Sequence, residues 1–327
     1  MVMGAPTGKI LVIKLAALGD FVQALGPFAA IRAHHPKAHL VLLTTRPYQE
    51  LAQATGLFDD IWLDSRPRGI NLAGWFKLRQ RLRGGRFERV YDLQTSDRSS
   101  FYFRLLSPGP KPDWSGIARG CSHPHANPAR DALHTIDRQA EQLKMAGIEN
   151  VPKPETTLTG AAFEPADEAF LGQLGITAPF ALLVPGGAAH RPEKRWPTAH
   201  FAGLANRLLT DGIQPVLLGG ESERQTLADI VRACPGAVDL AGRTGLADLV
   251  RLARAARSAV GNDTGPAHLI ATAGCPSLVL YSAASDPALC GQRGAVVKIL
   301  RRDRLADLGQ EDVWAALKTL AASGMLA

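Results

Sequence analysis

The sequence predicts an α/β protein with two domains, each built on a doubly wound parallel sheet. The chain has 327 residues, which is long for one compact core and suits two domains of ordinary size. Short apolar runs alternate with amphipathic segments in both halves, as expected for strands that alternate with helices. This alternation favours parallel strand pairing and a sheet covered by helices on both faces.

The composition predicts a cytosolic protein that keeps its thiols reduced. Hydrophobic residues make up 46% of the chain, yet no apolar run approaches the ~18 residues of a membrane span. The N-terminus passes directly into a strand-like run and lacks the layout of a signal peptide. The four cysteines form no CxxC pair, so neither a zinc ribbon nor a disulfide framework is predicted.

An N-terminal domain is predicted over residues 1–155, followed by a linker at 156–178. Its strands are expected at 9–15, 38–45, 59–64 and 89–94, and its helices at 20–35, 47–56 and 131–147. A basic helix is expected within 66–89. Residues 107–131 are rich in Pro, Gly and polar side chains and are predicted to form a long surface loop.

Three histidines in or near this predicted loop raise the question of a metal site. They are His123, His125 and His134. Prolines interrupt the segment, and no carboxylate or thiol stands at a standard ligand spacing, so we predict no metal.

The C-terminal domain is predicted over residues 179–308 and has the more regular pattern. Its strands are expected at 179–185, 214–220, 237–242, 258–262 and 277–282, and its helices at 198–210, 221–233, 246–256 and 266–273. A last segment, 309–327, is predicted to hold a helix at about 310–322. This helix is a candidate to pack back on the N-terminal domain.

The positive charge of the chain is concentrated in one stretch. The formal net charge is +7, and residues 66–89 contain eight Arg or Lys residues and a single Glu. The stretch is either a solvated helix face or a patch for an anionic partner, such as lipid headgroups or nucleic acid. Apolar Trp75, Phe76, Leu78 and Leu82 favour an interfacial helix, and the chain has no nucleic-acid-binding motif.

We therefore predict peripheral contact with an anionic membrane surface and no nucleic-acid partner. The residues expected to form this patch are Arg79, Arg81 and Arg83.

The loops at the carboxyl ends of the C-terminal strands carry the residues of a predicted diphosphate site, since ligands of open α/β sheets bind at this edge. Gly186 and Gly187 follow the first strand and let backbone N–H groups approach a ligand, and Lys194 adds positive charge. After the fourth strand, Asp263, Thr264 and Gly265 stand at the start of a helix, whose unpaired N–H groups favour an anion.

A carboxylate in a neighbouring loop, Glu223, could hold the hydroxyls of a ribose. The chain has neither a GxGxxG after its first strand nor a GxxxxGK[ST] motif. These absences argue against a classical dinucleotide-binding fold and against a P-loop NTPase.

Each of these residues also has a purely structural interpretation. Asp263 and Thr264 could be helix caps, and His268 could be a core histidine. Capping alone explains neither His268 nor the glycine, so the functional interpretation is preferred for the loop as a set. Asp20 follows Gly19 at a helix start in the N-terminal half. The pattern leaves open whether Asp20 is a general base, a ligand contact or an N-cap.

Several motifs resemble glycosyltransferase family 9, the ADP-heptose:lipopolysaccharide heptosyltransferases. They are LAALGDF at 15–21, DLQTSDRS at 92–99, KRWP at 194–197, GGESE at 219–223 and the stretch 241–276, which contains GNDTGPAHL. The resemblance covers nearly the whole chain. It implies the GT-B fold, in which two Rossmann-like domains face each other across a cleft, with acceptor bound by the N-terminal domain and donor by the C-terminal domain.

The resemblance also implies a role for each matching residue. Asp20 would be the general base, Lys194 would hold the donor diphosphate and Glu223 the adenosine ribose. Asp263, Thr264, Gly265 and His268 would form the donor sugar and phosphate motif, with Asp263 orienting sugar hydroxyls or a neighbouring cation. The reaction would be a direct, inverting and metal-independent displacement. The expected donor is ADP-heptose, and the expected acceptor is lipid-linked or of lipopolysaccharide type.

Three alanines depart from the family pattern. Family members often have serine where Ala16 and Ala17 stand, and a hydroxyl residue near Ala188. These changes bear on the acceptor geometry and on the phosphate contacts.

Two other functions are compatible with the predicted fold and site. One is a nucleotide-sugar 2-epimerase of the same fold, and the other is a non-catalytic protein that binds a sugar nucleotide or a lipid.

Overall fold

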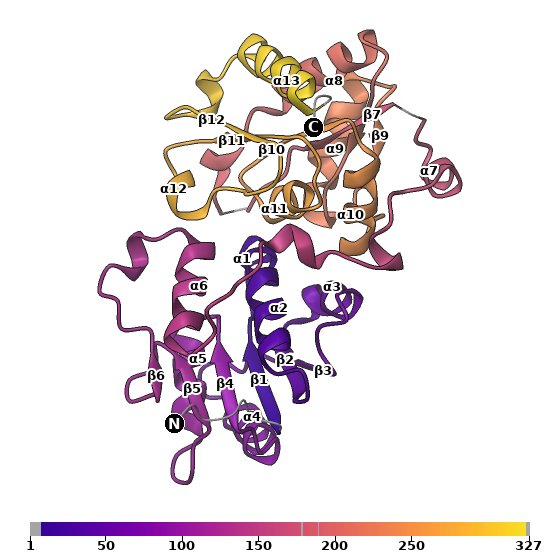
Figure 1. Cartoon of the computed structure of the whole chain (residues 1–327). Helices are drawn as coiled ribbons and strands as arrows, with labels where there is room; N and C mark the ends of the chain where they lie inside the picture. The colour runs from indigo at the N-terminus through magenta and orange to yellow at the C-terminus, as the bar shows by residue number, and fades with distance from the viewer. Residues whose placement is uncertain (1–7, 178, 189, 325–327) are drawn as a thin grey trace. The chain divides into compact units, whose positions relative to one another are not determined.

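The computed structural model describes residues 8–177, 179–188 and 190–324 (Figure 1). The chain forms two compact units that divide between Thr157 and Leu158. Each unit contains one parallel six-stranded sheet with helices packed beside it. The prediction of two doubly wound α/β domains is therefore confirmed.

The N-terminal sheet has the strand order β3-β2-β1-β4-β5-β6. The strands are β1 (Lys9–Ile13), β2 (His39–Thr44), β3 (Asp60–Leu63), β4 (Arg89–Asp92), β5 (Asp113–Gly116) and β6 (His123–Pro124). The chain adds strands on one side of β1 and then on the other, so the order reverses between β1 and β4. In open parallel sheets this reversal is where ligands bind.

Among residues 8–157, six α-helices accompany this sheet. They are α1 (Leu18–Gln23), α2 (Leu25–His34), α3 (Gln49–Ala54), α4 (Leu72–Gly84), α5 (Asp97–Leu105) and α6 (Thr135–Met145). Alternate side chains of the central strands, such as Leu11 and Ile13, pack against Leu78 of α4 and Phe103 of α5. Because these central strands are covered on both faces, their sequences are apolar almost throughout.

The structure differs from the sequence prediction at three places in this unit, one of which is α5, where no helix was predicted. The predicted loop 107–131 contains the edge strands β5 and β6, which pair in parallel with β4 and with each other. Their sequences are short and rich in polar residues and glycine, so only pairing with a formed neighbour makes them strands. The predicted helix 20–35 is instead two helices, α1 and α2, that meet at Ala24.

The C-terminal sheet has the order β12-β11-β10-β7-β8-β9. The strands are β7 (Phe180–Val184), β8 (Gln214–Leu217), β9 (Val238–Asp239), β10 (Ser258–Asn262), β11 (Ser277–Tyr281) and β12 (Val297–Arg301). The order reverses between β7 and β10, which places their carboxyl ends next to each other. The edge strand β12 was not predicted, because its residues appear in the sequence as part of a basic run.

Seven α-helices belong to the described part of this unit. They are α7 (Glu168–Leu174), α8 (Thr198–Thr210), α9 (Arg224–Ala233), α10 (Leu246–Ala255), α11 (Gly265–Thr272), α12 (Pro287–Cys290) and α13 (Gln310–Gly324). Among the helices of the described residues, none combines the length and the apolar character that crossing a bilayer requires.

The C-terminal helix α13 packs within its own unit. Val313, Trp314 and Leu317 join the same buried core as Trp196 and Phe201. Its apolar face is buried against the C-terminal sheet and α8, and the expectation that this helix also packs back on the N-terminal domain stays a prediction.

Most of the predicted linker, 156–178, also belongs to the C-terminal unit. Arg254 of α10 donates hydrogen bonds to the carbonyl oxygens of Phe163 and Leu158, at 2.5 and 2.6 Å. The N–H of Ala166 donates to the carbonyl of Arg251 at 3.0 Å. Residues 158–167 are therefore fixed on α10 and are part of the folded unit.

Candidate functional site

The carboxyl edge of the C-terminal sheet brings together two loops that are far apart in the sequence. One loop follows β7 and contains Gly186, Gly187 and Lys194. The other follows β10 and leads through Asp263 and Thr264 into α11. Because β7 and β10 pair directly, their loops leave the sheet side by side.

Asn262, the last residue of β10, ties these loops together. It is fully buried, and its Nδ2 donates to the carbonyl oxygens of Pro185 at 2.9 Å and Gly186 at 3.0 Å. Its Oδ1 accepts from the N–H of Trp196 at 3.0 Å. The sequence analysis assigned Asn262 no role, although an amide at the end of a buried strand is a signal for such a function. These three bonds fix both ends of the loop that carries Lys194.

Lys194 and Asp263 form the central ion pair of the site. The Nζ of Lys194 lies 2.7 Å from Oδ2 of Asp263, and the two side chains are 18% and 7% exposed. Burial acts to raise the pKa of Asp263, but the hydrogen bond and charge of Lys194 outweigh it, so this pKa lies below its ordinary value. The carboxylate is therefore ionised at neutral pH, with a cation beside it.

Three further residues, which the sequence analysis missed, complete the surroundings of Asp263. The hydroxyl of Ser285 donates to Oδ2 at 2.8 Å, and Nε2 of Gln292 donates to Oδ1 at 3.2 Å. The hydroxyl of Tyr281 donates to Oε1 of Gln292 at 2.8 Å, which leaves the amide N–H group of Gln292 for Asp263. Burial raises the pKa of Tyr281, so this hydroxyl remains a donor. All three follow or end β11, whose carboxyl end adjoins that of β10.

The start of α11 offers hydrogen-bond donors to a ligand. Thr264 is the extended residue before the helix, with φ −144° and ψ 163°, and its side chain does not cap the helix. Its Oγ1 is buried and has no hydrogen-bond partner among the described residues. The first-turn N–H groups of a helix lack partners within the helix, so this end favours an anion. His268 is buried on the same helix, and its N–H bonds to the carbonyl of Thr264 at 3.3 Å.

Glu223 lies against Gly186 of the β7 loop. A Cβ atom at Gly186 would stand 2.7 Å from Cγ of Glu223, so this approach needs a glycine. The carboxylate accepts from the N–H of Gly220 at 2.9 Å and from the hydroxyl of Ser222 at 2.8 Å. The carbonyl of Gly187 accepts from Arg195 at 2.5 Å. The predicted nucleoside and phosphate residues thus occupy one edge of the sheet.

In the N-terminal unit, Asp20 lies on α1 at the carboxyl edge of its sheet. The residue is half-buried, and its Oδ2 accepts from the N–H of Ala17 at 3.2 Å. This bond is one half of a capping box: Ala17 is the N-cap residue of α1, and Asp20 stands at the third helical position and is not the N-cap itself. The bond occupies one carboxylate oxygen only. Asp20 can therefore cap α1 and still present its second oxygen to a ligand.

The loop before α1 is fixed by a residue of the DLQTSDRS motif. Oε1 of Gln94 accepts from the N–H groups of Leu15 at 2.7 Å and Ala16 at 3.1 Å. Buried Lys14 donates to the carbonyl of Leu93 at 3.0 Å. Burial lowers the pKa of Lys14, while the charge of Asp20 acts to raise it. The quoted motif therefore positions the Asp20 loop, a role that the sequence alone did not reveal.

Next to this motif, at the end of β4, stands the buried Asp92. Its Oδ1 accepts from the N–H groups of Gln94 and Thr95, both at 3.1 Å. Burial raises the pKa of Asp92 to about 6. This carboxyl shapes the turn after β4.

The histidines of segment 107–134 have structural partners. Nε2 of His125 lies 2.7 Å from a carboxylate oxygen of Glu141, and Nδ1 of His134 accepts from the N–H of Ile136 at the start of α6. Within residues 8–177, 179–188 and 190–324, no group of three or more His, Cys, Asp or Glu side chains is arranged to hold a metal ion.

The three arginines of the predicted membrane patch are held by backbone carbonyls of their own unit. Arg79 donates to Leu105 at 2.8 Å, Arg81 to Leu63 at 3.1 Å, and Arg83 to Pro108 at 2.7 Å. The guanidinium of Arg81 also lies 4.4 Å from the ring centre of Trp62. These side chains fasten α4 to the unit.

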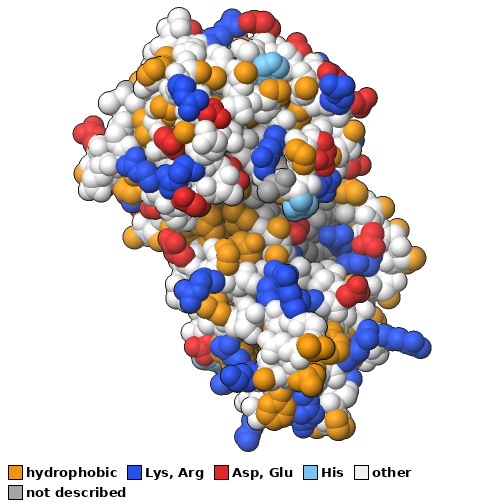
Figure 2. Space-filling model, turned by 180° about the vertical axis from the view of Figure 1, so that it is seen from behind, with side chains coloured by type: hydrophobic (Ala, Val, Ile, Leu, Met, Phe, Trp, Pro, Cys, Tyr) orange, Lys and Arg blue, Asp and Glu red, His pale blue; other side chains and the backbone are white. Residues whose placement is uncertain are grey.

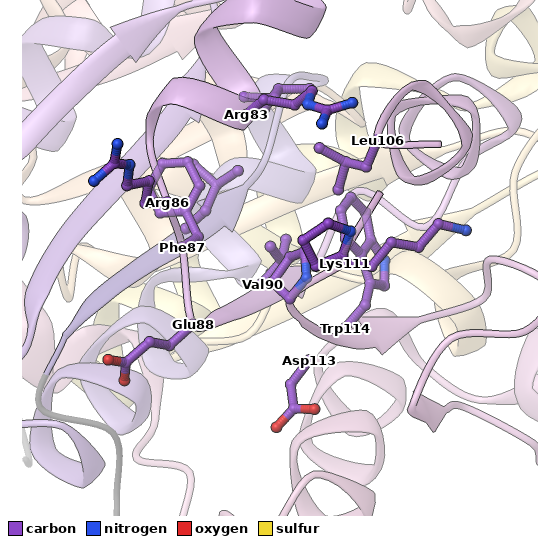
Figure 3. Close-up of a pocket in the computed structure, with 13 residues that line it drawn as sticks. Arg83, Arg86, Phe87, Glu88, Val90, Leu106, Lys111, Asp113 and Trp114 are labelled. Carbon is purple, nitrogen blue, oxygen red and sulfur yellow. The ribbon is translucent and has the colours of Figure 1, made fainter. Parts of the chain in front are cut away.

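A cavity of about 570 Å³ lies at the opposite edge of the N-terminal sheet from Asp20 (Figure 3). Its lining includes Glu88 and Asp113, at the starts of β4 and β5, together with Leu106 and Trp114. Because Asp20 follows the carboxyl end of β1, this cavity is not part of the predicted site.

Comparison with known proteins identifies the family. The sequence model of glycosyltransferase family 9 (heptosyltransferase) matches residues 75–310. Lipopolysaccharide heptosyltransferase 2 of Escherichia coli is 25% identical over 300 residues, which cover 85% of this chain and 83% of that protein.

Solved structures share the fold over nearly the whole chain. E. coli ADP-heptose LPS heptosyltransferase II superposes with a TM-score of 0.79 at 21% identity, covering 96% of this chain and 99% of that one. A family 9 glycosyltransferase from Veillonella parvula gives a TM-score of 0.83 at 21% identity, with coverage of 98% and 99%. UDP-GlcNAc 2-epimerase from Methanocaldococcus jannaschii gives a TM-score of 0.59 at 10% identity, covering 96% of this chain and 92% of that one. The family match spans well over half of the chain, and the chain therefore belongs to glycosyltransferase family 9.

Proposed function

We propose that this glycosyltransferase transfers heptose from ADP-heptose to an acceptor of lipopolysaccharide type, with inversion at the anomeric carbon. The observation that carries the proposal is the pairing of Lys194 with Asp263 beside the start of α11. Support comes from the family membership and from relatives named as lipopolysaccharide heptosyltransferases.

The donor diphosphate would bind at the start of α11. Its oxygens would accept from the free N–H groups of the helix, beginning at Gly265, and from the unpartnered hydroxyl of Thr264. Lys194 would neutralise the charge that develops as the bond from the anomeric carbon to the phosphate oxygen breaks. Asp263 would hold Lys194 in place and accept from sugar hydroxyls. His268, on the same helix, completes this set.

The nucleoside would extend along the sheet edge towards Glu223. One carboxylate oxygen of Glu223 is bonded to the backbone of Gly220, so the side chain is oriented before the ligand binds. Gly186 and Gly187 would allow the chain to approach the ribose and phosphates closely.

Asp20 would act as the general base. Its carboxylate would take the proton of the acceptor hydroxyl as that oxygen attacks the anomeric carbon, and the nucleoside diphosphate would leave. We propose that the reaction needs no metal ion, because Lys194 and the α11 N–H groups supply positive charge at the leaving group. Alanines at 16, 17 and 188 remove hydroxyl donors that family members often have, so acceptor choice is where this enzyme is expected to differ.

The acceptor is proposed to be lipid-linked and reached from the cytoplasmic face of the plasma membrane. The basic stretch 66–89 would give peripheral contact with anionic lipid. No nucleic-acid partner is proposed.

Two measurements test the proposal. A thermal-shift panel of ADP-, UDP- and GDP-sugars should show stabilisation by ADP-sugars, and Lys194→Ala should remove it. Transfer should fall sharply in Asp20→Ala while the ADP-sugar shift remains. A UDP or GDP preference would refute the heptose assignment. Inversion at C2 of a UDP-sugar would favour the epimerase alternative, and undiminished transfer by Asp20→Ala would remove Asp20 as the base.

A further inference from the structure

The largest exposed apolar side chains of the described residues gather in one region of the N-terminal unit. Four of the six are Ile70, Leu72, Phe76 and Phe101, which are 95%, 76%, 56% and 39% exposed. The first three lie in the loop before α4 and in its first turns, and Phe101 lies on α5. Figure 2 shows one face of the molecule, on which hydrophobic side chains and Lys or Arg side chains lie side by side. We call the four residues the apolar tip.

The backbone under the apolar tip is fixed. Arg98, in the first turn of α5, donates to the carbonyl of Pro67 at 3.2 Å, and the indole N–H of Trp75 donates to the carbonyl of Gly69 at 3.2 Å. The side chain of Asn71 caps α4 by accepting from the N–H of Gly74 at 2.9 Å. Ile70 and Leu72 therefore stand exposed on a pinned turn and cannot fold back into the core.

The two helices of the apolar tip form one surface. The rings of Trp75 on α4 and Phe101 on α5 meet edge to face, with centroids 5.0 Å apart. The guanidinium of Arg98 lies 5.6 Å from the ring centre of Trp75. Since α5 begins just after the carboxyl end of β4, this surface adjoins the edge of the sheet to which Asp20 belongs.

The charged residues of the segment that carries Ile70, Leu72 and Phe76 have one sign, whereas α5 has an exposed Asp97 in its first turn. Residues 65–87 contain no Asp or Glu. Arg66, Arg68 and Lys77 are exposed, and within the described residues none of their side chains has an ion-pair or hydrogen-bond partner. Exposed apolar side chains with neighbouring cations that have no ion-pair partner are complementary to an anionic lipid interface, which offers acyl chains beneath phosphate headgroups.

We infer that the apolar tip inserts into the acyl region of an anionic membrane, with Arg66, Arg68 and Lys77 on the headgroup phosphates. The inference deepens the membrane contact given under the proposed function and rests on it. It assigns insertion to residues 70–76 and Phe101, whereas Arg79, Arg81 and Arg83 are held by backbone carbonyls and serve to position α4. Insertion here would hold the acceptor-binding unit at the surface from which a lipid-linked acceptor projects.

The test is sedimentation of the full chain with vesicles of phosphatidylethanolamine and phosphatidylglycerol, compared with phosphatidylcholine vesicles. Wild type should bind the anionic vesicles, and Ile70→Ser/Leu72→Ser should lower the partition coefficient by about tenfold or more. Met145→Ser is the matched control, because Met145 is 41% exposed but lies outside the apolar tip. It should bind like wild type. Brominated acyl chains should quench the tryptophan emission of wild type, and Trp75→Phe should remove most of that quenching.

Three results would overturn the inference. They are absence of wild-type binding, equal binding by Ile70→Ser/Leu72→Ser, and a wild-type dimer that this variant converts to a monomer without any vesicle binding. Transfer to a water-soluble acceptor without acyl chains should be unchanged in the variant. If wild type shows no transfer at all, the proposed function fails, while the vesicle result still decides the inference.

Discussion

Replacing Lys194 by methionine would test whether the ion pair with Asp263 organises the donor site. Methionine keeps much of the side-chain volume but removes the charge that lies 2.7 Å from Oδ2 of Asp263. Asp263 is only 7% exposed, so its carboxylate would lose its main compensating charge. Breaking a buried pair costs about 3–5 kcal/mol when one charge is left unpaired. Ser285 and Gln292 still donate hydrogen bonds to Asp263, and Lys194 is partly exposed. We therefore expect the substitution to lower the free energy of unfolding by about 2 kcal/mol.

The loss of stability in Lys194→Met should be larger at neutral pH than at acid pH. In the wild type the pKa of Asp263 is depressed, so its ionisation stabilises the fold above the unfolded-state pKa of about 4. This contribution disappears as the pH falls through the folded-state pKa. The variant should therefore be about 2 kcal/mol less stable at neutral pH, and the difference should shrink below about pH 4.

The assay is urea unfolding followed by tryptophan fluorescence. Trp196 is buried in the C-terminal core and its backbone N–H bonds to Asn262, so the emission includes a probe close to the site. A double-mutant cycle with Asp263→Asn should return a coupling energy of about 1–3 kcal/mol. The ion pair does not organise the site if the free energy of unfolding of Lys194→Met lies within about 0.5 kcal/mol of the wild-type value at pH 7. The same conclusion follows if the difference in stability is unchanged at acid pH.

Three further substitutions follow from the same geometry. Asp20→Asn should lower kcat by about 10²–10⁴-fold in a transfer assay while ADP still raises Tm, and a normal kcat would exclude base catalysis by Asp20. Gly186→Ala should weaken ADP binding in calorimetry, because its Cβ would stand 2.7 Å from Cγ of Glu223. Gly172→Ala is the matched control, with nothing within 4 Å, and equal affinity of the two variants would refute the argument. Asn262→Ala should lower the free energy of unfolding in urea by about 2–4 kcal/mol, since three buried hydrogen bonds are lost. A change below about 1 kcal/mol would show that these hydrogen bonds are not what fixes the loops.

The order of apolar and polar residues along the chain is enough to predict the class of fold and the residue types at the sheet edge. Apolar strands at 9–13, 180–184 and 258–262 are short runs that periodicity can locate, because every side chain of a covered parallel strand is buried. Local signals also mark the glycines, Lys194 and the Asp263–Gly265 turn, since loop chemistry depends on residue type. The alternation of elements then implied two parallel sheets.

Which of these residues contact each other depends on the packing of the whole unit. Lys194 and Asp263 are 69 positions apart, and they form a pair because β7 and β10 are neighbours in the sheet. The same strand order brings Ser285 and Gln292 to Asp263, which no local pattern indicates. β5, β6 and the placement of α13 also depend on distant partners. Strand order and side-chain contacts are set by burial summed over the whole unit, whereas a sequence pattern reports only the environment of its own segment.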